Sequence, residues 1–88
     1  MKKLSLPSDE NGWEIMPGSI VRANLALANM SQRDLEARLK RLDLYCSSSN
    51  ISSKLAWGTF SAAFFLQALV AIGVETLELP IAKSSDDA

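Results

Sequence analysis

The fold of this chain is decided by residues 30–74, which read MSQRDLEARLKRLDLYCSSSNISSKLAWGTFSAAFFLQALVAIGV. This stretch holds three segments with apolar residues at helical spacing, separated by serines and by Gly58. Serine is common at the start of a helix, and glycine is common just past its end. The order of these signals predicts three consecutive helices.

The first of the three helices is predicted to start at Ser31. Asp34 follows three positions later, which makes a short-armed capping box and puts a negative charge at the positive end of the helix dipole. The buried stripe of this helix consists of Leu35, Leu39 and Leu42. It is expected to end near residue 43.

The other two helices follow the same logic. One of the serines at 47–49 is expected to cap a helix that buries Ile51 and Leu55 and ends at Gly58. Thr59 or Ser61 caps the last helix, and Gly73 ends it. The apolar face of the last helix consists of Phe64, Phe65, Ala68, Leu69 and Ile72.

The N-terminal part is predicted to be an arm over residues 1–18, because Pro7, the stretch DENG at 9–12 and the pair Pro17-Gly18 are turn and breaker signals. The alternation of Trp13 and Ile15 allows a short strand in this arm. A first helix then starts with Ser19 as its cap. It carries two apolar stripes, which are Ile20, Ala23, Leu27 and Met30, and Val21, Leu25 and Ala28. Two stripes exceed what one core contact requires, so another surface is expected to pack against this helix.

Residues 75–88 are predicted to form a short strand and a frayed tail. Leu77, Leu79 and Ile81 alternate with polar residues or proline, and Pro80 would place the strand at a sheet edge. The two terminal strands could pair with each other or with a second copy of the chain. The chain thus divides into an arm (1–18), a helical domain (19–74) and a C-terminal segment (75–88).

Length, composition and charge limit the possible functions. The 88 residues are 48% apolar, enough for one self-sufficient domain. The net charge is −1, but residues 17–60 hold six basic and three acidic side chains. This central positive charge is compatible with phosphate binding, although it is weaker than that of most dedicated DNA-binding proteins.

Several classes of protein are disfavoured. The single Cys46 excludes an intramolecular disulfide and favours a cytoplasmic protein with this thiol as a small buried filler. The apolar run at residues 60–74 is shorter than the roughly 20 residues that a membrane span needs. The chain has no histidine and no recognised nucleophile motif, so we expect neither an enzyme nor a metal or cofactor site.

The segment Met30-Ser31-Gln32-Arg33-Asp34-Leu35, followed by Asn50-Ile51-Ser52-Ser53-Lys54-Leu55, a glycine and a leucine-rich helix, resembles the Cro/repressor-type helix-turn-helix fold. Residues 50–74 are more closely similar to a bacterial family of small helix-turn-helix domains of unknown function. The resemblance covers roughly residues 20–79. It implies an all-α, four-helix, lambda-repressor-like domain with short terminal arms.

The resemblance implies a small regulator that binds duplex DNA as a homodimer. Gln32 would contact a phosphate, and the helix over residues 48–57 would enter the major groove. The expected DNA-binding residues are Gln32, Arg33, Ser48, Ser49, Asn50, Ser52, Ser53 and Lys54. Asn50 is suited to reading adenine, whereas the serines at 47–49 are equally well explained as a loop and a helix cap.

Some residues depart from the repressor pattern. Glu36 stands where a small residue is usual, the turn lacks a glycine, and Trp57 and Thr59 flank Gly58 where the related small domains have basic residues. We expect Trp57 to cover the core; the alternative is an exposed anchor for a partner.

These departures leave a second hypothesis open. It is a protein-interaction module, such as a phage-type inhibitor or an antitoxin, that binds its partner through Trp57, Trp13 and Leu25 and no longer binds DNA. The positions of the basic side chains bear on this choice. Groove binding has electrostatic support only if Arg33, Arg38, Lys40 and Lys54 share a face with Asn50 and Ser53.

Overall fold

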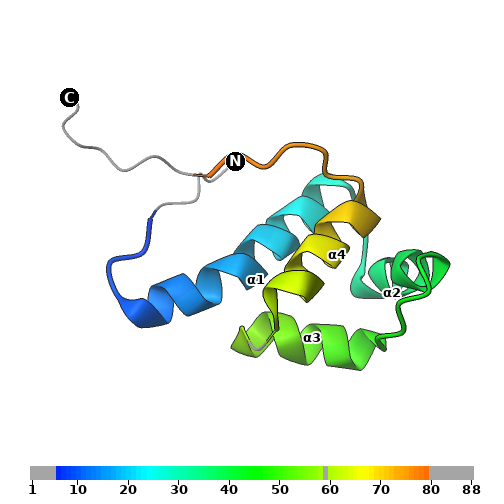
Figure 1. The fold of residues 1–88 in the computed structure, drawn as a ribbon, viewed down its shortest axis with the longest axis horizontal. Helices are drawn as coiled ribbons and strands as arrows, with labels where there is room; N and C mark the ends of the chain where they lie inside the picture. Colours follow the sequence, from blue (N-terminus) through cyan, green and yellow to red (C-terminus); the bar gives the residue numbers. More distant parts are fainter. Residues whose placement is uncertain (1–5, 59, 80–88) are drawn as a thin grey trace.

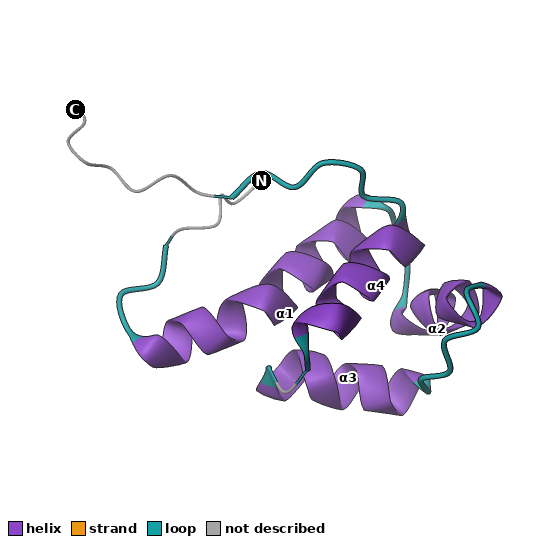
Figure 2. Ribbon diagram, viewed as in Figure 1, coloured by secondary structure: helices purple, strands orange, loops and turns teal. Residues whose placement is uncertain are grey.

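The computed structural model describes residues 6–58 and 60–79 of the chain. Within these residues it contains four α-helices and no strand (Figures 1 and 2). The helices are α1 (Glu10–Leu27), α2 (Gln32–Arg41), α3 (Ser48–Trp57) and α4 (Ala62–Ile72). The prediction of an all-α, four-helix domain is confirmed.

The two early helices pack across the two late ones. α1 contacts α3 and α4, and α2 contacts the same two helices. Figure 1 shows α4 lying across α1, with α3 at the lower side and α2 at one end. A single core takes residues from every helix. Its most completely buried large side chains are Val21, Leu35, Leu39, Ile51 and Leu55.

The predicted boundaries of α2, α3 and α4 are confirmed. α2 begins with a capping box, in which the Ser31 N–H donates to Oδ2 of Asp34 at 2.8 Å and the Asp34 N–H donates to Oγ of Ser31 at 3.1 Å. Ser47 caps α3 and Ser61 caps α4. Gly58 and Gly73 end α3 and α4 with φ values of 65° and 99°. These signals act within a few residues of the chain, so the sequence is sufficient to predict them.

The capping box makes stability depend on pH. The N–H of Ser31 and then its hydroxyl hold the pKa of Asp34 below the ordinary value of 3.8. Because the folded pKa is lowered, this stabilisation is present above about pH 4 and is lost as the pH falls through the folded pKa. We expect Asp34→Asn to lower the midpoint of thermal unfolding at neutral pH and to flatten its fall between about pH 4 and pH 2.

The matched control is Asp43→Asn, which removes another exposed carboxylate outside any capping box. Unfolding followed by circular dichroism at several pH values compares the two variants. Equal effects of both variants at every pH would show that the capping box contributes nothing of its own.

α1 differs from its prediction. It begins at Glu10, so residues 10–18 are helical where the sequence predicts an arm with a short strand, and Ser19 is not its cap. The cap is Asp9, whose Oδ1 accepts a hydrogen bond from the Gly12 N–H at 2.8 Å. Pro17 lies inside the helix and cannot donate the usual bond to the carbonyl of Trp13. The breaker signals are therefore overridden.

The reason is tertiary packing. Met16 and Ile20 are buried in the core on either side of Gly18. A Cβ on Gly18 would lie 2.8 Å from the carbonyl oxygen of Leu55 in α3, so only glycine allows the two backbones to approach this closely. Burial of this part of α1 outweighs its poor intrinsic helix propensity.

Two leucines that the helical spacing places in the core are exposed. Leu27, at the end of α1, is 64% exposed, and Leu42 is 45% exposed. Leu42 is the C-cap of α2, where the backbone leaves the helix, and Leu44 packs against the core instead. Ala28 is also exposed.

The two stripes of α1 do not need a second surface. Ile20 comes from one stripe, Val21 and Leu25 come from the other, and all three are buried in the same core. The second stripe is therefore used by the core of the chain itself, and the packing of another surface on this helix stays a prediction.

The described part of the C-terminal segment, residues 75–79, is not a strand. Val74 and Leu77 pack against the core instead. Ile81 and the predicted frayed tail lie outside the described residues. Because Trp13 and Ile15 are helical, the N-terminal partner for the predicted strand pairing is also missing.

Candidate functional site

The outer face of α3 is polar. Ile51 and Leu55 are its buried residues. The exposed side chains are those of Ser49, Asn50, Ser52, Ser53, Ala56 and Trp57. The core uses none of these exposed side chains, so they are available to a ligand. Ser48, which was expected to join them, is half-buried in the first turn.

The N-terminus of α3 is held by a carboxylate from α2. The Ser48 N–H donates to Oε1 of Glu36 at 3.1 Å, and the Asn50 N–H donates to Oγ of Ser47 at 3.2 Å. Free N–H groups at a helix start form a natural anion site. Here two acceptors of the chain itself use part of that site. Glu36, which departs from the repressor pattern, therefore has a structural role in tying α3 to α2.

The C-terminus of α3 is held by α1. Nη1 of Arg22 donates to the carbonyl oxygen of Leu55 at 2.9 Å. The same oxygen faces Gly18, whose missing side chain leaves room for it. A cation at the last turn of a helix also interacts favourably with the helix dipole. Residues in α1 and α2 thus fix both ends of α3.

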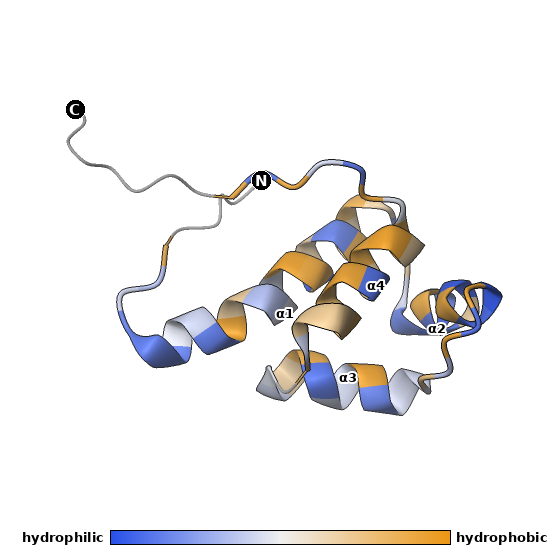
Figure 3. Ribbon diagram, in the orientation of Figure 1, coloured by the Kyte–Doolittle hydropathy of each residue, from blue (hydrophilic) through white to orange (hydrophobic). Residues whose placement is uncertain are grey.

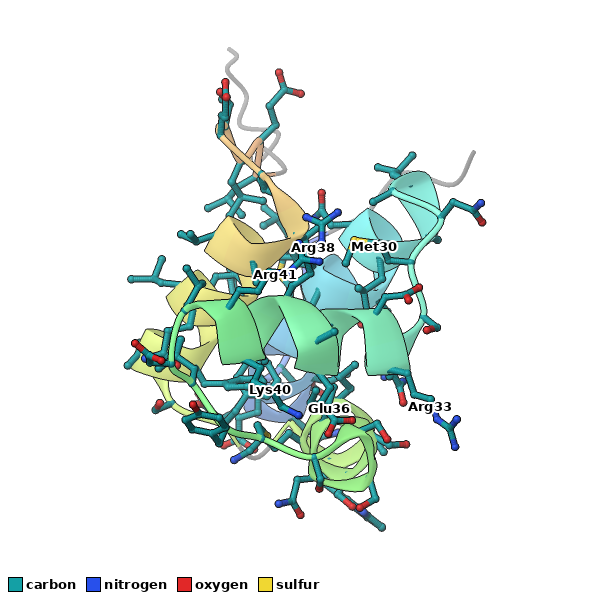
Figure 4. The ribbon with its side chains drawn as sticks, turned by 90° about the vertical axis from the view of Figure 1, so that its right-hand side faces the viewer. Met30, Arg33, Glu36, Arg38, Lys40 and Arg41 are labelled. Atoms are coloured by element: carbon teal, nitrogen blue, oxygen red, sulfur yellow. The ribbon has the colours of Figure 1, made fainter. Side chains whose placement is uncertain are left out.

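The basic side chains of α2 are divided between two sides of the helix (Figure 4). Arg33 and Lys40 lie on the side toward α3, together with Glu36. Arg38 and Arg41 lie on the opposite side, where Nη1 of Arg38 donates to the carbonyl oxygen of Ala71 at 3.3 Å. Only half of the basic side chains of α2 therefore flank α3.

The start of α2 lies on the accessible surface. Arg33 is exposed, and Gln32, the expected phosphate contact, is half-buried in the first turn.

Lys54 does not join the exposed polar face of α3. Its ammonium nitrogen lies 5.3 Å from the centroid of the Phe64 ring in α4, which is the geometry of a cation–π contact. The side chain is half-buried, and it lines an open hollow with Cys46 and Phe64. Groove binding would have full electrostatic support if four basic residues shared a face with Asn50 and Ser53. Arg38 and Lys54 point elsewhere, so this condition is not met, and of the four only Arg33 and Lys40 lie toward α3.

The residues of the alternative hypothesis fall into two groups. Trp57 is 76% exposed, so the expectation that it covers the core is wrong. It is the last residue of α3, and Gly58 rather than Trp57 packs against the backbone of Glu14. Trp13 is 50% exposed, whereas Leu25 is only 5% exposed and cannot contact a partner. Trp57 and Trp13 therefore remain candidates, and Leu25 does not.

Sequence reasoning missed the roles of Glu36, Arg22 and Arg38. Each of these side chains bonds a backbone atom at the end of a helix that lies 12 or 33 residues further along the chain. No local pattern signals such a bond. The misfit of Glu36 to the repressor pattern is the one signal in the sequence that points to its role.

The described residues contain neither a candidate metal site nor a candidate membrane-spanning helix. No group of three His, Cys, Asp or Glu side chains in residues 6–58 and 60–79 could hold a metal ion. Among the helices described, none combines the length and the apolar character that crossing a membrane requires. Cys46 is half-buried against the core rather than fully buried.

Comparison with known proteins gives one match. A family model with the description "Domain of unknown function (DUF6471)" matches residues 13–77. Neither the curated proteins nor the solved structures yield a match to the chain. The predicted resemblance to a domain of unknown function is confirmed, and the match begins inside α1, within the stretch that the sequence assigns to an arm.

Proposed function

The chain belongs to the DUF6471 family, and from the arrangement of α2 and α3 we propose that it is a small DNA-binding regulator of helix-turn-helix type. In this proposal α3 enters the major groove of duplex DNA, and two copies of the chain bind together as a homodimer. Gln32 and Arg33, at the start of α2, contact the phosphate backbone.

One observation carries the proposal. The exposed face of α3 consists mainly of short polar side chains, including Ser49, Asn50 and Ser53, which the core does not use. Side chains of this kind can form hydrogen bonds with the base edges that the major groove exposes. Asparagine can form two hydrogen bonds with adenine, and serine can bond either a base or a phosphate.

The charges on this surface predict weak binding with a low dependence on salt. Arg33 and Lys40 flank α3, while Glu36 places a negative charge at its N-terminus. Two charged phosphate contacts per subunit make four in the homodimer, which corresponds to a slope of about −3.6 for the logarithm of the binding constant against the logarithm of salt concentration. Dedicated DNA-binding proteins with more contacts have steeper slopes.

The proposal is tested by fluorescence anisotropy with a duplex of about 20 base pairs, long enough for two half-sites. At about 50 mM salt we expect binding in the micromolar range. Arg33→Ala removes one contact from each subunit, so it should weaken binding and make the salt slope shallower by about 1.8. The matched control is Arg41→Ala, on the other side of α2, which should leave both quantities unchanged.

A second variant is expected to bind DNA more tightly than the wild type. Glu36→Gln keeps an acceptor for the Ser48 N–H and removes the negative charge at the start of α3. We expect it to tighten binding by about threefold to tenfold, because one unit charge near a phosphate contributes about 1 kcal/mol. Equal affinities for wild type, Glu36→Gln and Arg33→Ala would contradict groove binding by α3.

A second candidate function is favoured by the exposure of Trp57. An indole that is 76% exposed at the end of a helix is typical of an anchor for a protein partner, and aromatic side chains dominate such contacts. The chain would then be a protein-interaction module, such as a phage-type inhibitor or an antitoxin. Absence of DNA binding at about 50 mM salt would select this candidate over the first.

A further inference from the structure

The outward face of α4 is made entirely of apolar side chains. Ala62, Ala63, Leu66 and Val70 are its exposed residues, and Leu66 and Val70 are 60% and 63% exposed. The opposite face is buried in the core. In Figure 3, α4 lies toward the viewer and is mostly in apolar colours, with a hydrophilic band; the polar residue of this helix is Gln67.

A helix that is apolar all round is normally buried. α4 comes close to this pattern, because its exposed residues are all apolar and its one polar residue, Gln67, is half-buried. α4 has 11 residues, about 16 Å in length, and is too short to cross a bilayer. Surface helices of monomeric domains carry polar residues on the outward face, which α4 lacks. We propose that a second copy of this chain covers the outward face of α4, in a symmetric dimer.

The absence of charge favours a second copy over a different partner. Residues 55–74 contain no charged side chain, so α4 itself offers no ion pair to a charged partner. The outward face of α4 is uncharged and apolar, and the same face on a second copy of the chain has the same properties. A contact of one surface patch with itself about a two-fold axis is the commonest way in which identical chains pair.

The order of side chains on α4 is also self-complementary. Ala62, Leu66 and Val70 follow one another at intervals of four residues, so they lie in one row along the helix. In an antiparallel pair centred on Leu66, Ala62 faces the partner's Val70, and Leu66 faces Leu66 of the partner subunit. A small side chain thus faces a branched one at both ends of the contact, as close packing of two helices requires.

The flanks of α4 extend the contact. A stable interface buries about 800 Å² on each partner, which is more than four side chains of one short helix supply. Leu27 is 64% exposed and lines the same hollow as Ile72 and Val74 at the end of α4. Trp57, 76% exposed, is the last residue of α3, the helix that precedes α4 in the chain. With these contributions we expect a dissociation constant in the micromolar range.

Sedimentation equilibrium of the full chain without DNA, from about 1 µM to about 500 µM, measures the association. We expect a monomer–dimer equilibrium that Leu66→Glu abolishes, because each dimer would then bury two unpaired carboxylates against each other. Ala37→Glu adds the same charge at an exposed position of α2 and should leave the equilibrium unchanged. Circular dichroism checks that both variants remain folded. A wild-type monomer at all concentrations, or equal loss of dimer in both variants, would overturn the proposal.

Disulfide cross-linking tests the antiparallel arrangement in a Cys46→Ser background. Ala62→Cys mixed with Val70→Cys should give a cross-linked heterodimer at least tenfold faster than either variant alone. Equal rates would contradict the proposed row-to-row contact. This inference rests on the proposed function in one respect, which is that the chain forms a homodimer. If DNA binding fails while the dimer persists, only the function falls.

Discussion

Leu35→Ala is expected to lower the free energy of unfolding by about 2–5 kcal/mol. Leu35 is fully buried between α2 and the helices that α2 contacts, so its removal leaves a cavity as well as a lost hydrophobic contact. A domain of this size has a total stability of roughly 5–15 kcal/mol, so the variant should be partly unfolded at physiological temperature. Urea denaturation followed by circular dichroism measures the change.

The matched control for Leu35→Ala is Leu42→Ala. Both leucines fit the apolar stripe that the sequence predicts for α2, but Leu42 is 45% exposed at the C-cap. Its replacement should change the unfolding free energy by less than about 1 kcal/mol. Similar losses for the two variants would mean that the end of α2 packs as the sequence pattern predicts and not as the structure describes.

Gly58→Ala is the second substitution with a large expected effect, at about 3 kcal/mol. Gly58 has a φ of 65°, which costs any other residue energy, and a Cβ there would lie 2.6 Å from the carbonyl oxygen of Glu14 in α1. Because the obstructing atom belongs to the backbone of a packed helix, α3 and α1 must separate to make room. Thermal unfolding should show a midpoint lower by more than 10 °C.

Gly73→Ala separates the two causes. Gly73 has a φ of 99°, but no atom lies within 4 Å of a Cβ built on it. This variant should therefore show the cost of the backbone conformation alone, about 1 kcal/mol. If both glycine variants lost the same stability, the close approach of Gly58 to Glu14 would have no energetic role.

The sequence predicts the last three helices well because their signals are local. Ser31 with Asp34, Gly58 and Gly73 each act within one turn of the chain, and the structure confirms all of them. α1 is mispredicted because the same local logic reads Pro17 and Gly18 as breakers. The packing of Gly18 against Leu55 lies 37 positions away in the sequence, and no local rule contains it.

The candidate site is predictable only in its residue types. Helical spacing from the buried Ile51 predicts that Ser53 faces outward and that Asn50 lies at the margin of the outer face, and both are exposed. Helical spacing does not predict where the long basic side chains lie. Lys54 and Arg38 could each extend into solvent or contact a residue of another helix. Lys54 lies over Phe64, and Arg38 bonds Ala71. Side chains of this length reach atoms that the helical period does not identify.

The packing of the early helices against the late ones bears on how the chain folds during synthesis. Arg22 and Arg38 each bond a carbonyl 33 residues further along, and α1 and α2 find their main contacts in α3 and α4. A nascent chain that ends before α4 therefore lacks one of the two helices against which α1 and α2 are buried. Complete burial of the first two helices has to wait until α4 has been synthesised, and until then part of the apolar surface of α1 and α2 is open to chaperones and proteases.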